Sequence, residues 1–228
     1  MESSRAWRDF FVGCRGRLKI PVNWGWRGNS KTNLALNQKN NLIKNNMPKK
    51  TSKITTPLCP TCLSNKDKIC EKCAKLYKDQ LINKIDIRVM RGIYEVVEKL
   101  ENIEAKVHKT ITCGEVFLIL CDEQSKPQLI GNCGLVAKEI SHKIKHNISI
   151  IAIPSQQTNE NLSTFFKQIF GEQVIKVEIL PQNINVTMNE DLQSKYFVKN
   201  EYLFKEVERA LKLAGIKKKM VFLKTNTL

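Results

Sequence analysis

Four cysteines within fifteen residues constrain the fold of this chain more than any other feature. The stretch "CPTCLSNKDKICEKC" holds two Cys-x2-Cys pairs, seven residues apart, at Cys59, Cys62, Cys70 and Cys73. Each pair turns the backbone so that both sulfurs point to one centre, and two pairs supply the four thiolates of a tetrahedral Zn²⁺ site. Four protein ligands leave no open coordination position for catalysis. The sequence therefore predicts one structural zinc ion in a compact knuckle over residues 57–78.

The alternatives for these cysteines are a chance cluster or a redox pair, and the matched spacing favours the metal site. The chain lacks the continuous apolar segment of a secretory signal, so we do not expect a disulfide framework from its eight cysteines. The polar "LSNKDKI" between the pairs predicts a short hairpin. No apolar run approaches the roughly 18 residues of a bilayer-spanning helix. We expect a soluble, cytoplasmic protein without a membrane partner.

The positive charge of the chain is concentrated near its start. The whole sequence has 38 Lys and Arg against 22 Asp and Glu, and residues 1–56 hold 12 of the basic and 2 of the acidic side chains. Such a balance favours polyanionic partners. Residues 1–56 have no sustained hydrophobic period, so they could be a flexible basic arm, a targeting peptide or sequence upstream of the true start. We expect disorder there, and Met47 as the more ordinary start.

The hydrophobic pattern of residues 81–154 predicts the order helix, strand, strand, helix, helix, strand. Apolar residues between Ile82 and Leu100 recur at helical spacing, and "IEAKVHKTIT" alternates like a half-buried strand. The run "EVFLILCD" is typical of a central strand. A short helix after Pro127 and the helical pattern "LVAKEISHKIKHN" precede the strand "ISIIAI".

The loop between those two helices has two glycines around two uncharged residues, in the order Gly131, Asn132, Cys133 and Gly134. Glycine at the first position permits a sharp turn, and glycine at the last opens the next helix without a Cβ. Backbone N–H groups at a helix N-terminus can face phosphates. The loop is therefore either a binding site for a nucleic-acid backbone or only a tight turn between core elements.

This loop, within the run Leu129 to Lys138, resembles the signature of the KH RNA-binding domain, and the preceding helix and strands match its type II arrangement. The resemblance implies a type II KH domain over residues 79–154, whose loop clamps about four nucleotides of single-stranded RNA. KH loops often carry Lys or Arg at the two middle positions, which are Asn132 and Cys133 here. The expected RNA contacts are thus mainly backbone N–H groups. The residues expected to bind RNA are Gly131, Asn132, Cys133 and Gly134, with Lys126 and Lys138 as flanking cations.

Residues 155–228 predict a related order of helix, strand, strand, helix and strand. "NLSTFFKQIFG" is typical of a capped helix that starts near Asn161 or Ser163 and ends at Gly171. "VIKVEIL" and "INVTM" predict a hairpin, "NEYLFKEVERALKLAG" a helix and "KKKMVFLK" a last strand. No Gly-x-x-Gly occurs in this part. We expect a second, degenerate KH-like module packed against the first.

A zinc knuckle, a type II KH domain and a degenerate partner together look like the archaeal NusA-like transcription elongation and termination factors, over about residues 57–224. This resemblance implies an α+β, non-enzymatic RNA-binding protein that works beside RNA polymerase. A ribosome-associated factor, acting in assembly or translation, would use the same modules. A third hypothesis is a zinc-scaffolded protein-interaction module whose KH fold has lost RNA. No nucleophile–base constellation, Walker loop or usefully spaced carboxylate pair suggests an enzyme.

Overall fold

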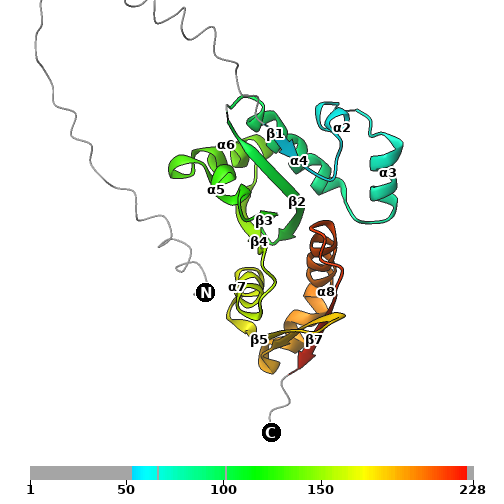
Figure 1. Cartoon of the computed structure of the whole chain (residues 1–228), viewed down its shortest axis with the longest axis vertical. Coiled ribbons are helices and arrows are strands. Elements are labelled where there is room, and N and C mark those ends of the chain that lie inside the picture. Colours follow the sequence, from blue (N-terminus) through cyan, green and yellow to red (C-terminus); the bar gives the residue numbers. More distant parts are fainter. Residues whose placement is uncertain (1–52, 66, 101, 225–228) are drawn as a thin grey trace, which may run out of the picture. The chain divides into compact units, whose positions relative to one another are not determined.

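The computed structural model describes residues 53–65, 67–100 and 102–224, all within one compact unit, with residues 190–200 and 224 as backbone only (Figure 1). It has the expected α+β class, with two small sheets. The first has the strand order β1 (Lys53–Thr55), β2 (Glu104–Cys113), β3 (Val116–Asp122), β4 (Asn147–Ile153). The second has the order β5 (Val174–Ile179), β6 (Asn183–Met188), β7 (Lys219–Lys224).

Strand β1 falls where the sequence predicted the last residues of a disordered extension. It pairs in parallel with β2, with Ile54 opposite Ala105, and Ile54 packs against the core. Three residues are too few to show a period of two, so the pattern could not reveal this strand. The rest of the predicted extension, residues 1–52, lies outside the described residues, as does Met47.

Helices cover both faces of the first sheet. On one face lie α4 (Lys84–Val97), α5 (Ser125–Ile130) and α6 (Leu135–Ile144). The other face packs against α7 (Asn159–Phe170) and α8 (Glu190–Leu213). The order α4-β2-β3-α5-α6-β4 agrees with the order predicted for residues 81–154.

Strand β3 shows why its sequence is apolar at every position from Val116 to Cys121. Phe117, Ile119 and Cys121 belong to the core cluster with α4, α5 and α6. Leu118 and Leu120, which alternate with them, belong to the cluster with α7, α8 and the second sheet. A strand that is covered on both faces has no solvent side on which to place polar residues.

The two sheets share one pattern of strand pairing. β2 and β5 run antiparallel to β3 and β6, and these in turn run parallel to β4 and β7. Figure 1 shows α7 and α8 between the two sheets. The order α7-β5-β6-α8-β7 is as predicted, although α7 begins earlier than expected: Thr158 is its N-cap and accepts a hydrogen bond from the Asn161 N–H.

The cysteine-rich segment forms two short helices, α2 (Pro60–Ser64) and α3 (Glu71–Lys78), and the predicted hairpin is wrong. The helices start because the first cysteine of each pair has extended backbone and serves as an N-cap. Buried side chains of this segment form a third core cluster, which Met90 of α4 joins. The segment is therefore packed onto α4.

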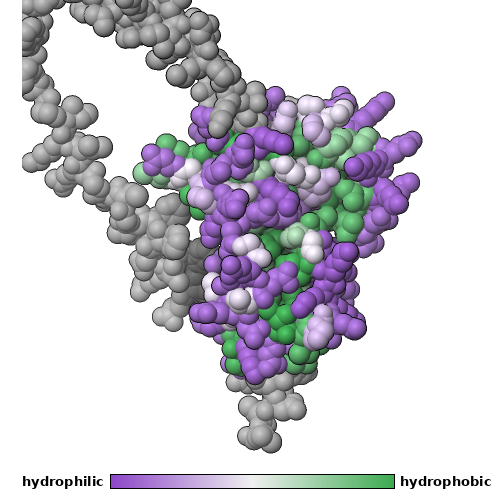
Figure 2. All heavy atoms as spheres, in the orientation of Figure 1, coloured by the Kyte–Doolittle hydropathy of each residue, from purple (hydrophilic) through white to green (hydrophobic). Residues whose placement is uncertain are grey.

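Figure 2 shows hydrophilic residues over much of one face, with hydrophobic residues visible between them. The exposed large hydrophobic side chains include Leu135, Ile175 and Tyr202. None of the described helices is long and apolar enough to cross a membrane.

Candidate metal centre and nucleic-acid interface

The four predicted metal ligands lie together. The Sγ atoms of Cys59, Cys62, Cys70 and Cys73 are all within 4.8 Å of one another. The Sγ atoms of Cys59 and Cys70 are 3.7 Å apart, far longer than the roughly 2.05 Å of a disulfide. A tetrahedron of sulfurs about 2.3 Å from a central Zn²⁺ has edges of about 3.8 Å. The cluster can therefore hold one tetrahedral ion.

Each cysteine pair lies at the start of a short helix, and the first cysteine of each pair donates its backbone N–H to a sulfur of the other pair. The Cys59 N–H donates to Cys73 Sγ at 3.4 Å, and the Cys70 N–H donates to Cys62 Sγ at 3.1 Å. Helix N-termini and N–H donors favour thiolate, the form that binds metal. A hydrogen bond from the Cys73 backbone N–H, with the neighbouring sulfurs, lowers the pKa of Cys70 to about 7. Burial raises the pKa of Cys73 to about 12, a penalty that a bound cation reverses by deprotonating the thiol.

Arg91 ties this centre to α4. Its Nε donates to the Cys62 carbonyl at 2.9 Å, and its Nη2 donates to the Lys68 carbonyl at 3.4 Å. The Cys62 carbonyl belongs to the first cysteine pair, and the Lys68 carbonyl lies in the segment between the two pairs. The metal centre and α4 are therefore joined by polar contacts as well as by the core around Met90.

The predicted RNA-binding loop joins α5 to α6 through unusual backbone angles. Gly131 has φ 70° and ψ 178°, a region essentially restricted to glycine, and its N–H ends α5 by donating to Pro127 O at 2.9 Å. Cys133 and Gly134 both adopt the left-handed conformation. A Cβ at Gly131 would lie 2.3 Å from Val136 Cγ2, whereas a Cβ at Gly134 would have no heavy atom within 4 Å. The two glycines thus have different roles.

We expect Gly131→Ala to lower the free energy of unfolding by roughly 2–5 kcal/mol, because it adds backbone strain and a steric clash. Gly134→Ala should cost only about 1–2 kcal/mol, since left-handed strain is its only penalty. Urea unfolding followed by circular dichroism measures both. Equal losses in the two variants would contradict this assignment of roles.

The loop leaves the N-terminus of α6 open. No side chain caps this helix, and its first turn, which lies wholly within the described residues, has no acidic residue. The Gly134 N–H donates to Gly131 O and the Leu135 N–H to Asn132 O, so these bonds shape the turn. Asn132 and Cys133 are exposed. Of the two predicted cations, Lys138 is exposed on α6, and Lys126 is half-buried on α5.

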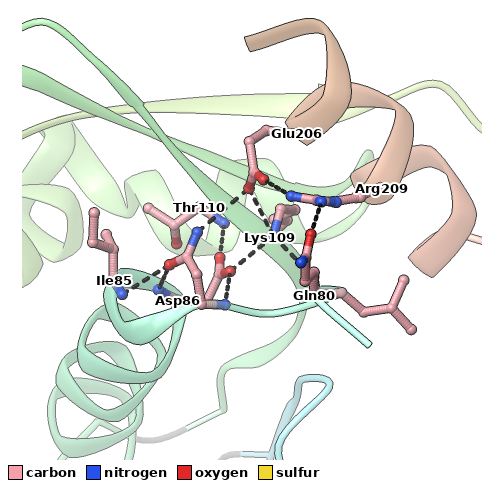
Figure 3. A network of polar contacts seen from close by, with 9 residues as sticks. Gln80, Ile85, Asp86, Lys109, Thr110, Glu206 and Arg209 are labelled. Atoms are coloured by element: carbon pink, nitrogen blue, oxygen red, sulfur yellow. Dashed lines mark hydrogen bonds and ion pairs between the residues drawn. The ribbon is translucent and has the colours of Figure 1, made fainter. Parts of the chain in front are cut away.

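A buried charge cluster, which sequence reasoning missed, joins β2 to α4 and α8 (Figure 3). Lys109 and Asp86 are 0% exposed and Glu206 is 1% exposed. The Lys109 ammonium lies 2.8 Å from Asp86 Oδ2 and 2.9 Å from Glu206 Oε2, and it also donates to Leu81 O at 2.9 Å. All three ammonium protons thus have acceptors, so we assign Lys109 a structural role.

The carboxylates of the cluster have further partners. Asp86 Oδ1 accepts from the Thr110 N–H at 2.7 Å, and Oδ2 accepts from the Asn83 N–H at 2.8 Å as half of a capping box. Arg209 pairs with Glu206. Burial raises the pKa of Asp86, and the Lys109 ammonium opposes that shift. The "NKID" capping box was readable from the sequence, but its link to Lys109 and Glu206 was not.

Comparisons with known proteins add no assignment. No family model matches the chain, and no curated protein matches it. One similar solved structure, described as "Crystal structure of APE1850", has 17% sequence identity and a TM-score of 0.37. The match covers 62% of this chain and 100% of the other. A likeness this weak carries no argument about function.

Proposed function

We propose that this chain is a non-enzymatic protein that binds single-stranded RNA through the Gly131–Gly134 loop. Residues 79–154 act as a type II KH domain, and residues 155–228 act as a degenerate KH-like partner. The biological role is that of a NusA-like transcription elongation or termination factor, which contacts the nascent transcript beside RNA polymerase. The element order α4-β2-β3-α5-α6-β4, with the glycine loop between α5 and α6, supports this proposal.

The observation that carries the proposal is the open N-terminus of α6. A helix N-terminus has partial positive charge and N–H groups that point outward, so it favours a phosphate. Here neither a side-chain cap nor a first-turn carboxylate competes for that position. Lys138, one turn into the same helix, adds a cation close to it.

Zinc is the proposed ion for the four cysteines, because a set of four thiolates in tetrahedral arrangement suits Zn²⁺. Its role is structural. It stabilises α2 and α3, and through Arg91 it stabilises their attachment to α4.

The double variant Asn132→Asp, Cys133→Asp tests the loop. Two carboxylates at the helix N-terminus should repel phosphate, so we expect at least a tenfold loss of affinity for a labelled single-stranded RNA in fluorescence anisotropy. The circular dichroism spectrum should not change, since both side chains are exposed.

The matched control is Gln156→Asp, Gln157→Asp, which makes the same charge change in another exposed loop. We expect this control to retain affinity within about twofold, because distant exposed charges are screened. An unchanged affinity in the Asn132→Asp, Cys133→Asp variant would move RNA binding away from the Gly131–Gly134 loop.

Experiments can distinguish two alternative functions from the proposed transcription role. A ribosome-associated factor would co-purify with ribosomal subunits, whereas a transcription factor would co-purify with RNA polymerase subunits. A protein-interaction role is favoured by Leu135, which is 61% exposed beside the uncharged centre of the loop. For that role, Leu135→Ser would abolish partner capture and RNA would not compete with the partner.

A further inference from the structure

A second basic feature lies at the other end of α6 from the glycine loop. A groove of about 330 Å³ runs between α4 and the end of α6. Its polar lining comprises Lys84, Arg88, Arg91, Lys143 and one carboxylate, Glu95. None of these residues is among those that the sequence predicted to bind RNA or metal.

Close packing of the two helices fixes the walls of this groove. Gly92 of α4 is buried against Ile144, and a Cβ at Gly92 would lie 2.6 Å from Ile144 Cγ2. Glycine thus lets the end of α6 approach α4. The groove belongs to the rigid packing of the first sheet, since Ile144 and Val89 share its core cluster.

Backbone carbonyls orient both arginines. Arg88 Nη2 donates to Ile144 O at 2.8 Å, and Arg91 Nε donates to Cys62 O at 2.9 Å. A guanidinium has five N–H donors in a fixed plane, so one such bond orients the group and leaves Arg88 with further donors for an anion. Side chains that are already ordered lose less entropy when a ligand binds.

The groove also has excess positive charge. Lys143 pairs with Glu95, while Lys84 is exposed and has no ion pair within the described part of the chain. The groove has four cations and one carboxylate. It therefore complements a phosphodiester backbone, which is uniformly negative, better than a protein surface that carries charges of both signs. Because α6 has ten residues, the groove lies about 15 Å from the loop, a distance that a few nucleotides can span.

We propose that the groove between α4 and α6 is a second phosphate-binding site, which holds the RNA backbone just outside the segment gripped by Gly131–Gly134. This inference rests on the proposed RNA-binding function and enlarges its footprint. The site recognises charge and not base identity, because its polar groups are cations suited to phosphates. The groove therefore strengthens the binding of longer RNAs without changing their sequence preference.

The test compares two labelled RNAs of about 5 and about 15 nucleotides, the shorter being just longer than the loop's expected segment. Lys84→Gln, Lys143→Gln removes one unpaired and one ion-paired lysine from the groove. Two lost phosphate contacts should lower affinity for the longer RNA roughly tenfold near 0.15 M salt and reduce the slope of log K against log salt by about 1.4. Affinity for the shorter RNA should not change.

Lys167→Gln, Lys205→Gln is the matched control, in which both lysines are exposed, on α7 and α8. Lys205 pairs with Glu201, and Lys167 has no ion pair among the residues that the structure describes. We expect it to change the affinity for either RNA less than twofold. An unchanged salt slope for the longer RNA in the groove variant would overturn the groove proposal, and so would an equal loss with the control. If the loop variant Asn132→Asp, Cys133→Asp binds both RNAs normally while the groove variant fails on the longer one, phosphate binding by the groove stands. The loop proposal then fails, and with it the placement of the groove beside a loop-bound segment.

Discussion

Lys109→Met is expected to lower the free energy of unfolding by about 3–5 kcal/mol, because it leaves the buried carboxylates of Asp86 and Glu206 without the ammonium between them. Methionine fills most of the volume of the lysine stem, so the loss reflects uncompensated charge rather than a cavity. Guanidinium or urea unfolding, followed by circular dichroism, measures the change. A loss under about 1 kcal/mol would falsify the proposed importance of this charge cluster.

Two further variants separate charge from packing. Lys205→Met, at an exposed i,i+4 ion pair with Glu201, should cost less than about 0.5 kcal/mol. Adding Glu206→Gln to Lys109→Met restores the charge balance of the cluster, in which Asp86 and Arg209 are then the charged groups that remain. The double variant should therefore be less destabilised than the sum of the two single variants, with an interaction free energy of roughly 1–3 kcal/mol.

The pH dependence of Lys109→Met has a definite sign. Burial raises the pKa of Asp86 in the folded protein, and Lys109 is the largest influence that opposes the rise. Without Lys109, Asp86 binds a proton more tightly in the folded state than in the unfolded state. The free energy of unfolding therefore falls as pH rises from the unfolded pKa of Asp86 through its folded pKa. The variant should therefore lose more stability relative to wild type at about pH 8 than at about pH 5. An equal loss at both pH values would mean that Asp86 stays ionised without its lysine.

Removal of the metal is expected to have the second large effect. Apparent binding free energies of structural zinc sites are on the order of 10 kcal/mol and contribute directly to folding. Chelation should release one ion per chain, measured by a colorimetric zinc indicator. It should also abolish hydrogen-exchange protection in α2 and α3, because two of their sulfurs belong to the core cluster that contains Met90.

Cys73→Ser should lose the ion and the same protection, whereas Cys113→Ser, at an exposed cysteine outside the cluster, should keep both. A metal-free chain whose α2 and α3 remain protected would show that apolar packing alone holds this segment. Acid should release the ion, because protons compete with it for the thiolates.

Much of the fold was predictable because its signals are local in the sequence. The spacing of Cys59 to Cys73 predicted a cluster able to hold one metal ion, and hydrophobic periods predicted the order of the elements from α4 to β4 and from α7 to β7. The cysteine helices α2 and α3 were missed because they have one and two turns, too few for a hydrophobic period. The assignment of RNA to Gly131–Gly134 stays a prediction.

The sequence by itself determined the α+β class, the cysteine cluster and the glycine loop, since each depends on residues that are neighbours along the chain. Only the tertiary structure decided which charged residues are buried together. Asp86, Lys109 and Glu206 come from three elements, and no pattern within any one of them indicates the other two. The same holds for the groove, which Lys84 and Lys143 both line because Gly92 lets α6 pack closely on α4. Periodicity reports which side of an element is buried, but the partner across the interface depends on packing between distant segments.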